Sequence, residues 1–238
     1  MLQVVFRKEF RDMVTSKRLL ILIGLFILFY VSGFFLLSSL GLTNIRRPII
    51  FFLRSYSSMI SLIAPLLGIA FGYDSIAGER EKGTLKIILA QPIYRDTLIL
   101  GKVFAFIAIT SLSIYASTFI SLGVFAALFG GNVGIEEVTR VLIVSLAAVL
   151  LSLIYYSISL LFSVLVKKSS QSALLSIAVW VILVVILPLV ATMVAFAVVG
   201  PPPRIRIGQP GANPKPGEMA KALREWSKKF NAVQSRVM

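Results

Sequence analysis

The residues whose chemistry could act on a partner or a substrate are concentrated in one segment, Asp74–Lys102. It contains four of the ten acidic residues of the 238-residue chain, together with five basic residues, and uncharged apolar stretches flank it on both sides. The sequence has no Cys and no His, which excludes disulfides, metal sites built on Cys or His, and His general bases. The segment is too charged to lie in lipid, and we interpret it as the place where the membrane part of the protein receives a mechanical input.

The elements around this segment are predicted to be membrane-spanning helices. The chain is 58% hydrophobic and only 14% charged, and several of its uncharged runs reach the roughly 20 residues that a bilayer requires. The runs are continuous rather than alternating, which disfavours a barrel. The predicted fold class is all-α, a polytopic transmembrane bundle with five visible spans, at about residues 19–40, 55–73, 103–129, 141–166 and 172–199.

An amphipathic helix is predicted to precede the first span. Phe6 and Phe10 fall on an apolar face, and Arg7, Lys8 and Arg11 occupy the remainder. A basic helix with an apolar stripe typically lies in the membrane interface. The alternative, a solvated extension of the first span, stays open.

The chain divides into a transmembrane domain, residues 1–199, and a tail, residues 200–238. The tail opens with a Pro- and Gly-rich connector and continues as a helix with a narrow apolar seam that includes Trp226 and Phe230. This helix could dock on the protein, lie on the membrane or pair with a second copy.

Basic residues in the short flanks predict the orientation. With a cytoplasmic amino terminus, the inside segments contain twelve Lys and Arg and the two outside loops contain four. Five spans then place the tail outside, as part of an extracytoplasmic loop, although its eight basic residues argue against that side. A sixth span would return the chain to the inside.

The charged segment itself has parts. Asp74–Lys82 is predicted to be a charged extension, Gly83 a hinge, and Thr84–Ala90 a short helix that Pro92 ends. Leu85, Ile88 and Leu89 form an apolar face on this helix. Such a face requires an apolar groove, which either lipid headgroups or a partner protein could supply.

Two stretches carry a resemblance to a known family. The run Asp74-Ser-Ile-Ala-Gly-Glu-Arg-Glu-Lys-Gly-Thr-Leu, followed by Pro92 and Gly101-Lys102, resembles the signature of ABC transporter permease subunits of the ABC-2 type. The opening Phe6-Arg7-Lys8-Glu9-Phe10-Arg11-Asp12 is similar to the start of the same family, in the branch whose ATPase is encoded separately. The resemblance covers about Met1 to Val199, and the family usually has six spans.

The resemblance implies that Thr84–Ala90 is a cytoplasmic coupling helix that docks on a nucleotide-binding subunit. The ATPase-coupling residues that it implies are Asp74, Glu79, Arg80, Glu81, Gly83, Thr84, Leu85, Ile88, Leu89 and Pro92. It also implies a plasma-membrane exporter, with an ABC ATPase and a second permease copy, as a homodimer, for partners. The net charge of +14 suits membrane lipid, and no basic face of a soluble fold indicates nucleic acid.

The sequence contains no P-loop motif, so this chain is not expected to hydrolyse ATP or to bind a cofactor; ATP and Mg²⁺ are expected on the partner. A secondary transporter or channel is the main alternative, but the predicted spans have no ionisable residue at the midplane. An intramembrane enzyme would need a serine-based site, and the many serines of the spans are better explained as hydrogen-bonding partners between helices.

Overall fold

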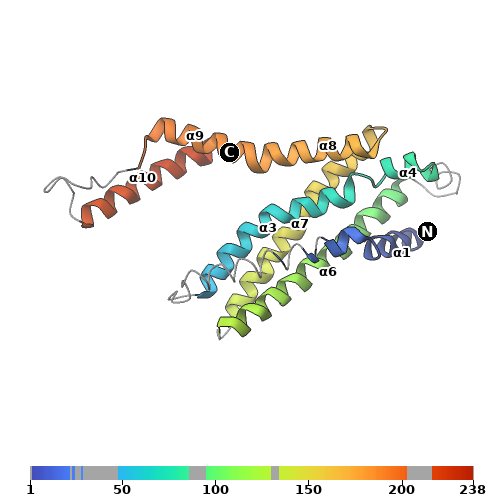
Figure 1. Ribbon diagram of the computed structural model, residues 1–238, viewed down its shortest axis with the longest axis horizontal. Helices are drawn as coiled ribbons and strands as arrows, with labels where there is room; N and C mark the ends of the chain where they lie inside the picture. The colour runs from blue at the N-terminus through green and yellow to red at the C-terminus, as the bar shows by residue number, and fades with distance from the viewer. Residues whose placement is uncertain are drawn as a thin grey trace. The chain divides into compact units, whose positions relative to one another are not determined.

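The computed structural model describes residues 2–21, 23–24, 28, 48–85, 95–129, 134–202 and 216–237. All elements in these ranges are helical (Figure 1). Four helical stretches are long and apolar enough to cross a membrane: Tyr56–Glu81, Asp96–Val124, Ile135–Leu165 and Ser169–Val199. They correspond to the second, third, fourth and fifth predicted spans. Most of the first predicted span, 19–40, lies outside the described residues.

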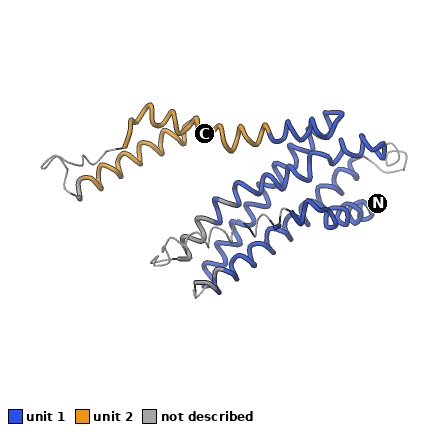
Figure 2. Tube along the Cα trace, in the orientation of Figure 1, with its two compact units in different colours: residues 1–177 blue, residues 178–238 orange. Residues whose placement is uncertain are grey.

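The chain forms two compact units, Met1–Ile177 and Ala178–Met238 (Figure 2). In the first unit, three long helices lie side by side: α3 (Pro48–Gly72), α6 (Arg95–Phe129) and α7 (Ile135–Leu165). The short helix α4 (Ala77–Glu81) follows α3, and α1 (Leu2–Val14) packs against α6.

Small residues bring α3 and α7 into close contact. Gly68 and Gly72 are one helical turn apart on α3, and a Cβ built on Gly68 would lie 2.3 Å from the carbonyl oxygen of Ser152. One on Gly72 would lie 2.7 Å from the Cβ of Ser159. Small residues at such positions let helix backbones approach in a membrane, where dispersion contacts and hydrogen bonds between helices drive association.

A buried hydroxyl cluster joins all three long helices. Tyr56 of α3 bonds to Thr118 of α6, and its hydroxyl lies 2.7 Å from that of Ser145 on α7. Thr118 and Ser145 are also 3.1 Å apart. The interpretation of the span serines and threonines as partners between helices is confirmed for Thr118, Ser145 and Ser159, which contacts Ser176. Other span serines bond instead to carbonyls of their own helix: Ser113, Ser117, Ser121 and Ser157.

The fifth predicted span is helical throughout, in three parts. They are α8 (Ser169–Trp180), a π-helical stretch η2 (Val181–Ile186) and α9 (Leu187–Val199). Pro188 is the second residue of α9 and directly follows the π-helical stretch. A local π-helical turn can re-pair the backbone groups that a proline leaves free, so the helix continues past it.

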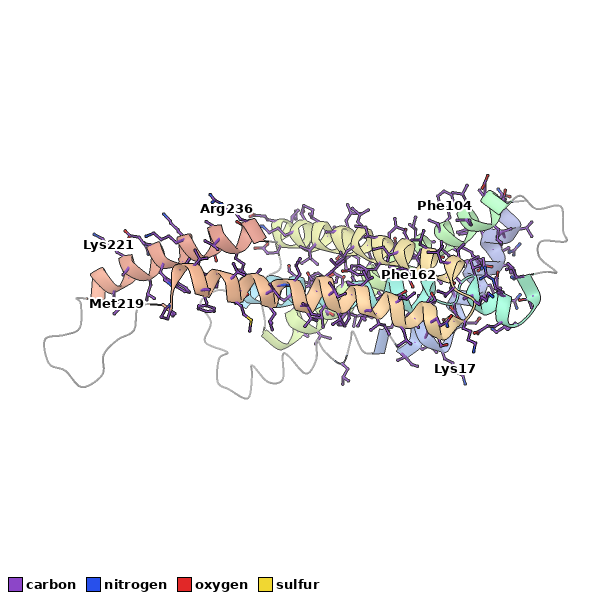
Figure 3. All side chains as sticks on the ribbon, turned by 90° about the horizontal axis from the view of Figure 1, so that it is seen from above. Lys17, Phe104, Phe162, Met219, Lys221 and Arg236 are labelled. Carbon is purple, nitrogen blue, oxygen red and sulfur yellow. The ribbon has the colours of Figure 1, made fainter. Side chains whose placement is uncertain are left out.

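In the second unit, α10 (Pro216–Val237) runs antiparallel to α9. The Trp226 indole donates a 2.9 Å bond to the carbonyl of Gly200, Phe230 contacts Phe196, and Gln234 donates to Thr192 at 3.2 Å. Of the positions left open for the tail helix, the structure supports docking on the protein. Lys221 and Arg236 lie on the side of α10 turned away from α9 (Figure 3).

Candidate functional site: a charged hub at the ends of the helices

The turn and short helix after α3 are fixed to α7 by one buried hydroxyl. The backbone N–H groups of Ile76 and Ala77 donate to the Ser163 Oγ, at 3.0 and 2.8 Å. These are donors that the start of α4 would otherwise leave unpaired. Ser163 therefore sets the position of Glu79, Arg80 and Glu81, which all lie on α4.

Lys102 pairs with two acids from different helices. Its Nζ lies 2.9 Å from Glu9 Oε2 on α1 and 2.8 Å from Glu79 Oε1 on α4. The lysine side chain is only 3% exposed. A buried cation between two carboxylates makes each group depend on the others, since an isolated buried charge is costly.

A glycine lets α1 approach closely enough for this pairing. A Cβ on Gly101, the residue before Lys102, would lie 2.6 Å from Val5 Cγ1. Val5, Glu9 and Met13 are the buried residues of α1. The buried face is therefore displaced by one position from the predicted face of Phe6 and Phe10, and it includes an acid.

Arg18 and Asp74 form a second link. The guanidinium donates two hydrogen bonds to the Asp74 carboxylate, at 2.8 and 2.7 Å, and a third to the carbonyl of Ala70 at 3.2 Å. The bonds to Asp74 raise the pKa of Arg18 above its ordinary value, against the opposing effect of burial. The pair connects the chain after α1 to the end of α3.

Arg80 and Glu81 contact the ends of α7 and α8. Arg80 donates to the carbonyls of Val166 and Val164, at 2.7 and 3.1 Å, and Glu81 Oε1 accepts from the N–H of Ser169 at 2.9 Å. A cation at a helix C-terminus and an anion at an N-terminus both complement the helix dipole. We call the set of Glu9, Arg18, Asp74, Glu79, Arg80, Glu81, Lys102 and Ser163 the charged hub.

Five residues of the hub, Glu9, Arg18, Asp74, Glu79 and Lys102, line a partly open cavity of about 370 Å³. Acids and bases both contribute to its wall, including Asp12, Lys17 and Lys82. The Oε2 atom of Glu79 is buried and has no hydrogen-bonding partner among the described residues. No group of acids in those residues has the arrangement of a metal site.

The structure places the predicted coupling residues as follows. Asp74, Glu79, Arg80 and Glu81 all contact helix ends of their own chain. Gly83 has a φ of +72°, which suits the predicted hinge because residues with a Cβ rarely adopt it. Thr84 is exposed and bonds to the carbonyl of Glu79 at 3.1 Å.

Leu85 is half-buried and packs against the apolar core of its own chain. The remaining predicted residues, Ile88, Leu89 and Pro92, lie outside the described residues. On α1, Phe6 and Phe10 stack with ring centroids 5.7 Å apart, while Arg7, Lys8 and Arg11 are exposed.

Sequence reasoning missed four members of the hub: Glu9, Arg18, Lys102 and Ser163. Glu9 could have been noticed in the sequence, because it is an acid one helical turn from Val5 on an otherwise basic helix. Lys102 could not, because basic residues commonly flank membrane spans. The small residue at Gly101 was a further signal, since it permits close approach. The sequence alone does not show that Lys102 pairs with Glu9 and Glu79, because that pairing depends on how the helices lie relative to one another.

The fold and site define a polytopic helical membrane protein whose charges gather at the ends of its spans. Residues 3–234 match the family described as ABC-2 family transporter protein. The chain belongs to this family, and the match extends past Val199 into the tail.

Two relatives are named as probable ABC transporter permease proteins NosY. The protein from Stutzerimonas stutzeri is 27% identical over 194 residues, which cover 77% of this chain and 67% of that protein. The one from Pseudomonas aeruginosa is 33% identical over 100 residues, 40% of this chain. That aligned segment spans about a third, 35%, of the Pseudomonas protein.

Proposed function

We propose that this chain is the permease subunit of an ATP-driven ABC exporter in the plasma membrane. A separate ABC ATPase subunit would dock on the predicted coupling helix, Thr84–Ala90. The observation that carries this proposal is the charged hub, which connects the segment directly before this helix to α1, α6, α7 and α8. The family membership supports the same function.

The hub suits the transmission of force. A push on Gly83 and the residues after it reaches α4 first, because Thr84 is bonded to the carbonyl of Glu79. Glu79 then acts on Lys102 and, through it, on Glu9 of α1. The contacts of Arg18 with Asp74, of Lys102 with two acids, and of Arg80 and Glu81 with the ends of α7 and α8 connect these elements. They would therefore move the ends of several spans together, rather than bending one loop.

We infer that ATP is hydrolysed outside this chain, because the sequence has no P-loop motif. We propose that ATP and Mg²⁺ bind to the partner ATPase and that two permease copies complete the transporter. Within this chain, only 6% of the most apolar part of Ser169–Val199 is buried. Its exposed apolar faces are available to a second copy or to membrane lipid.

A secondary transporter or channel is less well supported. In the described parts of the four candidate spans, the charged side chains lie near the ends, in the hub or in the first turns of α6 and α7. Ion-coupled carriers usually place such residues near the midplane. Uptake or efflux that continues without ATP in sealed vesicles would favour this alternative.

The orientation is tested by cysteine labelling, which needs no background substitutions because the chain has no Cys. We expect Lys82→Cys, at an exposed position beside the hub, to react in intact cells only with reagents that cross the membrane. Ile135→Cys, 88% exposed at the start of α7, should react with impermeant reagents added outside. The reverse pattern would refute a cytoplasmic amino terminus.

The ATPase partner is tested by copurification from the source organism in mild detergent. We expect the tagged chain to retain a P-loop ATPase, and Ile88→Asp to reduce its recovery at least tenfold, since a charge would face an apolar groove. Leu85 is a poorer probe, because it also packs on its own core.

Ile135→Asp is the matched control for this experiment, as it places the same charge at the exposed first residue of α7. It should leave ATPase recovery unchanged. A monodisperse wild-type preparation that transports without any ATPase would contradict the proposal, as would full recovery of the ATPase with Ile88→Asp.

A further inference from the structure

An apolar groove of about 410 Å³ lies between α1 and α6, apart from the charged hub. Its walls are Leu2 and Phe6 on α1 and Phe104, Ile107 and Ala108 on α6, and Gln3 lies at its edge. This volume is within the range of small-molecule sites, about 300–1,000 Å³. Phe104 is 48% exposed and lies at the edge of the helices in Figure 3.

The position of the groove indicates what fills it. Phe104, Ile107 and Ala108 belong to the candidate span Asp96–Val124, whose mean hydropathy is 2.0. An apolar groove on a membrane span faces hydrocarbon rather than water, so its natural occupant is a lipid acyl chain. Leu2 of α1 is 39% exposed at the same place, so this helix contributes a wall without closing the groove.

A shallow, open hollow lined by basic residues adjoins the groove, and all of its described lining residues belong to α1. Gln3, Arg7 and Arg11 follow one another at four-residue spacing on one helix face, and Gln3 lines both spaces. The other residues of the hollow are Val4, Lys8 and Asp12, so three bases face one acid. Among the described residues, Lys8 has an ion pair, with Glu9, whereas no ion pair engages Arg7 or Arg11.

We propose that the groove and the hollow together bind one anionic phospholipid, with an acyl chain between Phe6 and Phe104 and its phosphate on Arg7 and Arg11. Guanidinium groups offer forked donors that match phosphate oxygens, which favours this headgroup contact. The excess of basic residues selects an anionic headgroup over a zwitterionic one. The site does not depend on the proposed ATPase partner, because it needs only α1 and α6.

The lipid has a structural consequence for the hub. Val5 and Glu9, next to the groove-lining residues on α1, hold that helix against Gly101 and Lys102. A lipid bound between α1 and α6 adds a second attachment between the same two helices. We therefore expect the anionic lipid to raise the temperature at which the purified protein unfolds.

Native mass spectrometry in mild detergent tests the site, by titration with phosphatidylglycerol and with phosphatidylcholine of identical acyl chains. The wild type should bind one phosphatidylglycerol at least about tenfold more tightly than phosphatidylcholine, since basic residues at a membrane surface each add to anionic lipid binding. Arg7→Gln with Arg11→Gln should remove this preference while chain binding persists. Lys228→Gln with Lys229→Gln, on α10, is the matched charge control and should keep it.

The groove is tested with Ala108→Trp, which fills it and should weaken binding of both lipids at least about tenfold. Ala116→Trp, an exposed position two turns further along α6, should bind as the wild type does. If Ala108→Trp does not fold, Phe104→Ala removes an exposed wall of the same groove and should also weaken binding.

Three results would overturn the proposal. They are equal binding of the two lipids to the wild type, an unchanged preference in the double arginine variant, and unchanged binding in the groove variant. A titration with inorganic phosphate is a further test of the site. If phosphate alone bound with the same dependence on Arg7 and Arg11 and displaced the lipid, the site would be an anion site rather than a lipid site.

Discussion

We expect Lys102→Met to destabilise the protein by about 3–5 kcal/mol, because it leaves two carboxylates buried without their shared cation. Glu9 and Glu79 are 9% and 16% exposed at the side chain, so water cannot readily replace the lysine. Methionine keeps most of the length and the apolar stem, so the loss would come from charge rather than from packing. The measurement is the temperature at which half of the detergent-solubilised protein remains monodisperse after heating.

The control for this prediction is Lys82→Met, an exposed lysine on the wall of the same cavity. It should change the midpoint little, because exposed charges contribute little to stability. Adding Glu9→Gln and Glu79→Gln to Lys102→Met should restore part of the loss, since the unpaired charges are then absent. A midpoint for Lys102→Met equal to that of the wild type would contradict the pairing.

Hydropathy was sufficient to predict the second to fifth spans, because a bilayer sets a minimum length of apolar chain that hardly depends on packing. The helices run beyond the predicted limits at their polar ends: α6 begins at Arg95 rather than 103, and α7 at Ile135 rather than 141. Charged residues in a first turn can remain helical in the interface. Hydropathy alone therefore predicts the part of each helix that lies in the hydrocarbon region, but not where the helix begins and ends.

Of the eight residues of the charged hub, four were predicted from the sequence to belong to one site. The sequence identified Asp74, Glu79, Arg80 and Glu81 as a cluster, but it gave no means of choosing between contacts with a partner and contacts within the chain. Helical periodicity places residues on a face of one helix. The pairing of Glu79 with Lys102 needs the crossing of α4, α1 and α6, which depends on a small residue at Gly101 and on a hydroxyl at Ser163.

The sequence was also insufficient to identify the partner of the tail helix. Its apolar seam predicted an amphipathic helix and left three partners open. The choice of α9 depends on matched spacing: Trp226, Phe230 and Gln234 are four residues apart, as are Gly200, Phe196 and Thr192 in the opposite direction. Such a register is visible in a sequence only after the two helices are known to be antiparallel.

We expect Gly68→Ala to separate α3 from α7 and to cost about 1–3 kcal/mol or more, which is the usual cost of overpacking. The added Cβ would lie 2.3 Å from the carbonyl oxygen of Ser152 and 2.6 Å from the backbone nitrogen of Tyr156. Because both atoms are backbone, no rotamer change can relieve the clash. The bond between Tyr56 and Ser145 would lengthen as the helices move apart. The midpoint of thermal unfolding in detergent is again the measurement.

Two further glycines make this prediction specific to the contact between the helices. Gly123→Ala, on α6, meets no atom within 4 Å, so it should be neutral or stabilise the helix by up to about 1 kcal/mol. Gly72→Ala should fall between the two, because its nearest neighbour is the Ser159 side chain, at 2.7 Å, although the Tyr156 carbonyl lies at 2.9 Å. If Gly68→Ala and Gly123→Ala unfolded at the same midpoint, the close contact between α3 and α7 would not contribute to the stability of the protein, and the prediction would be wrong.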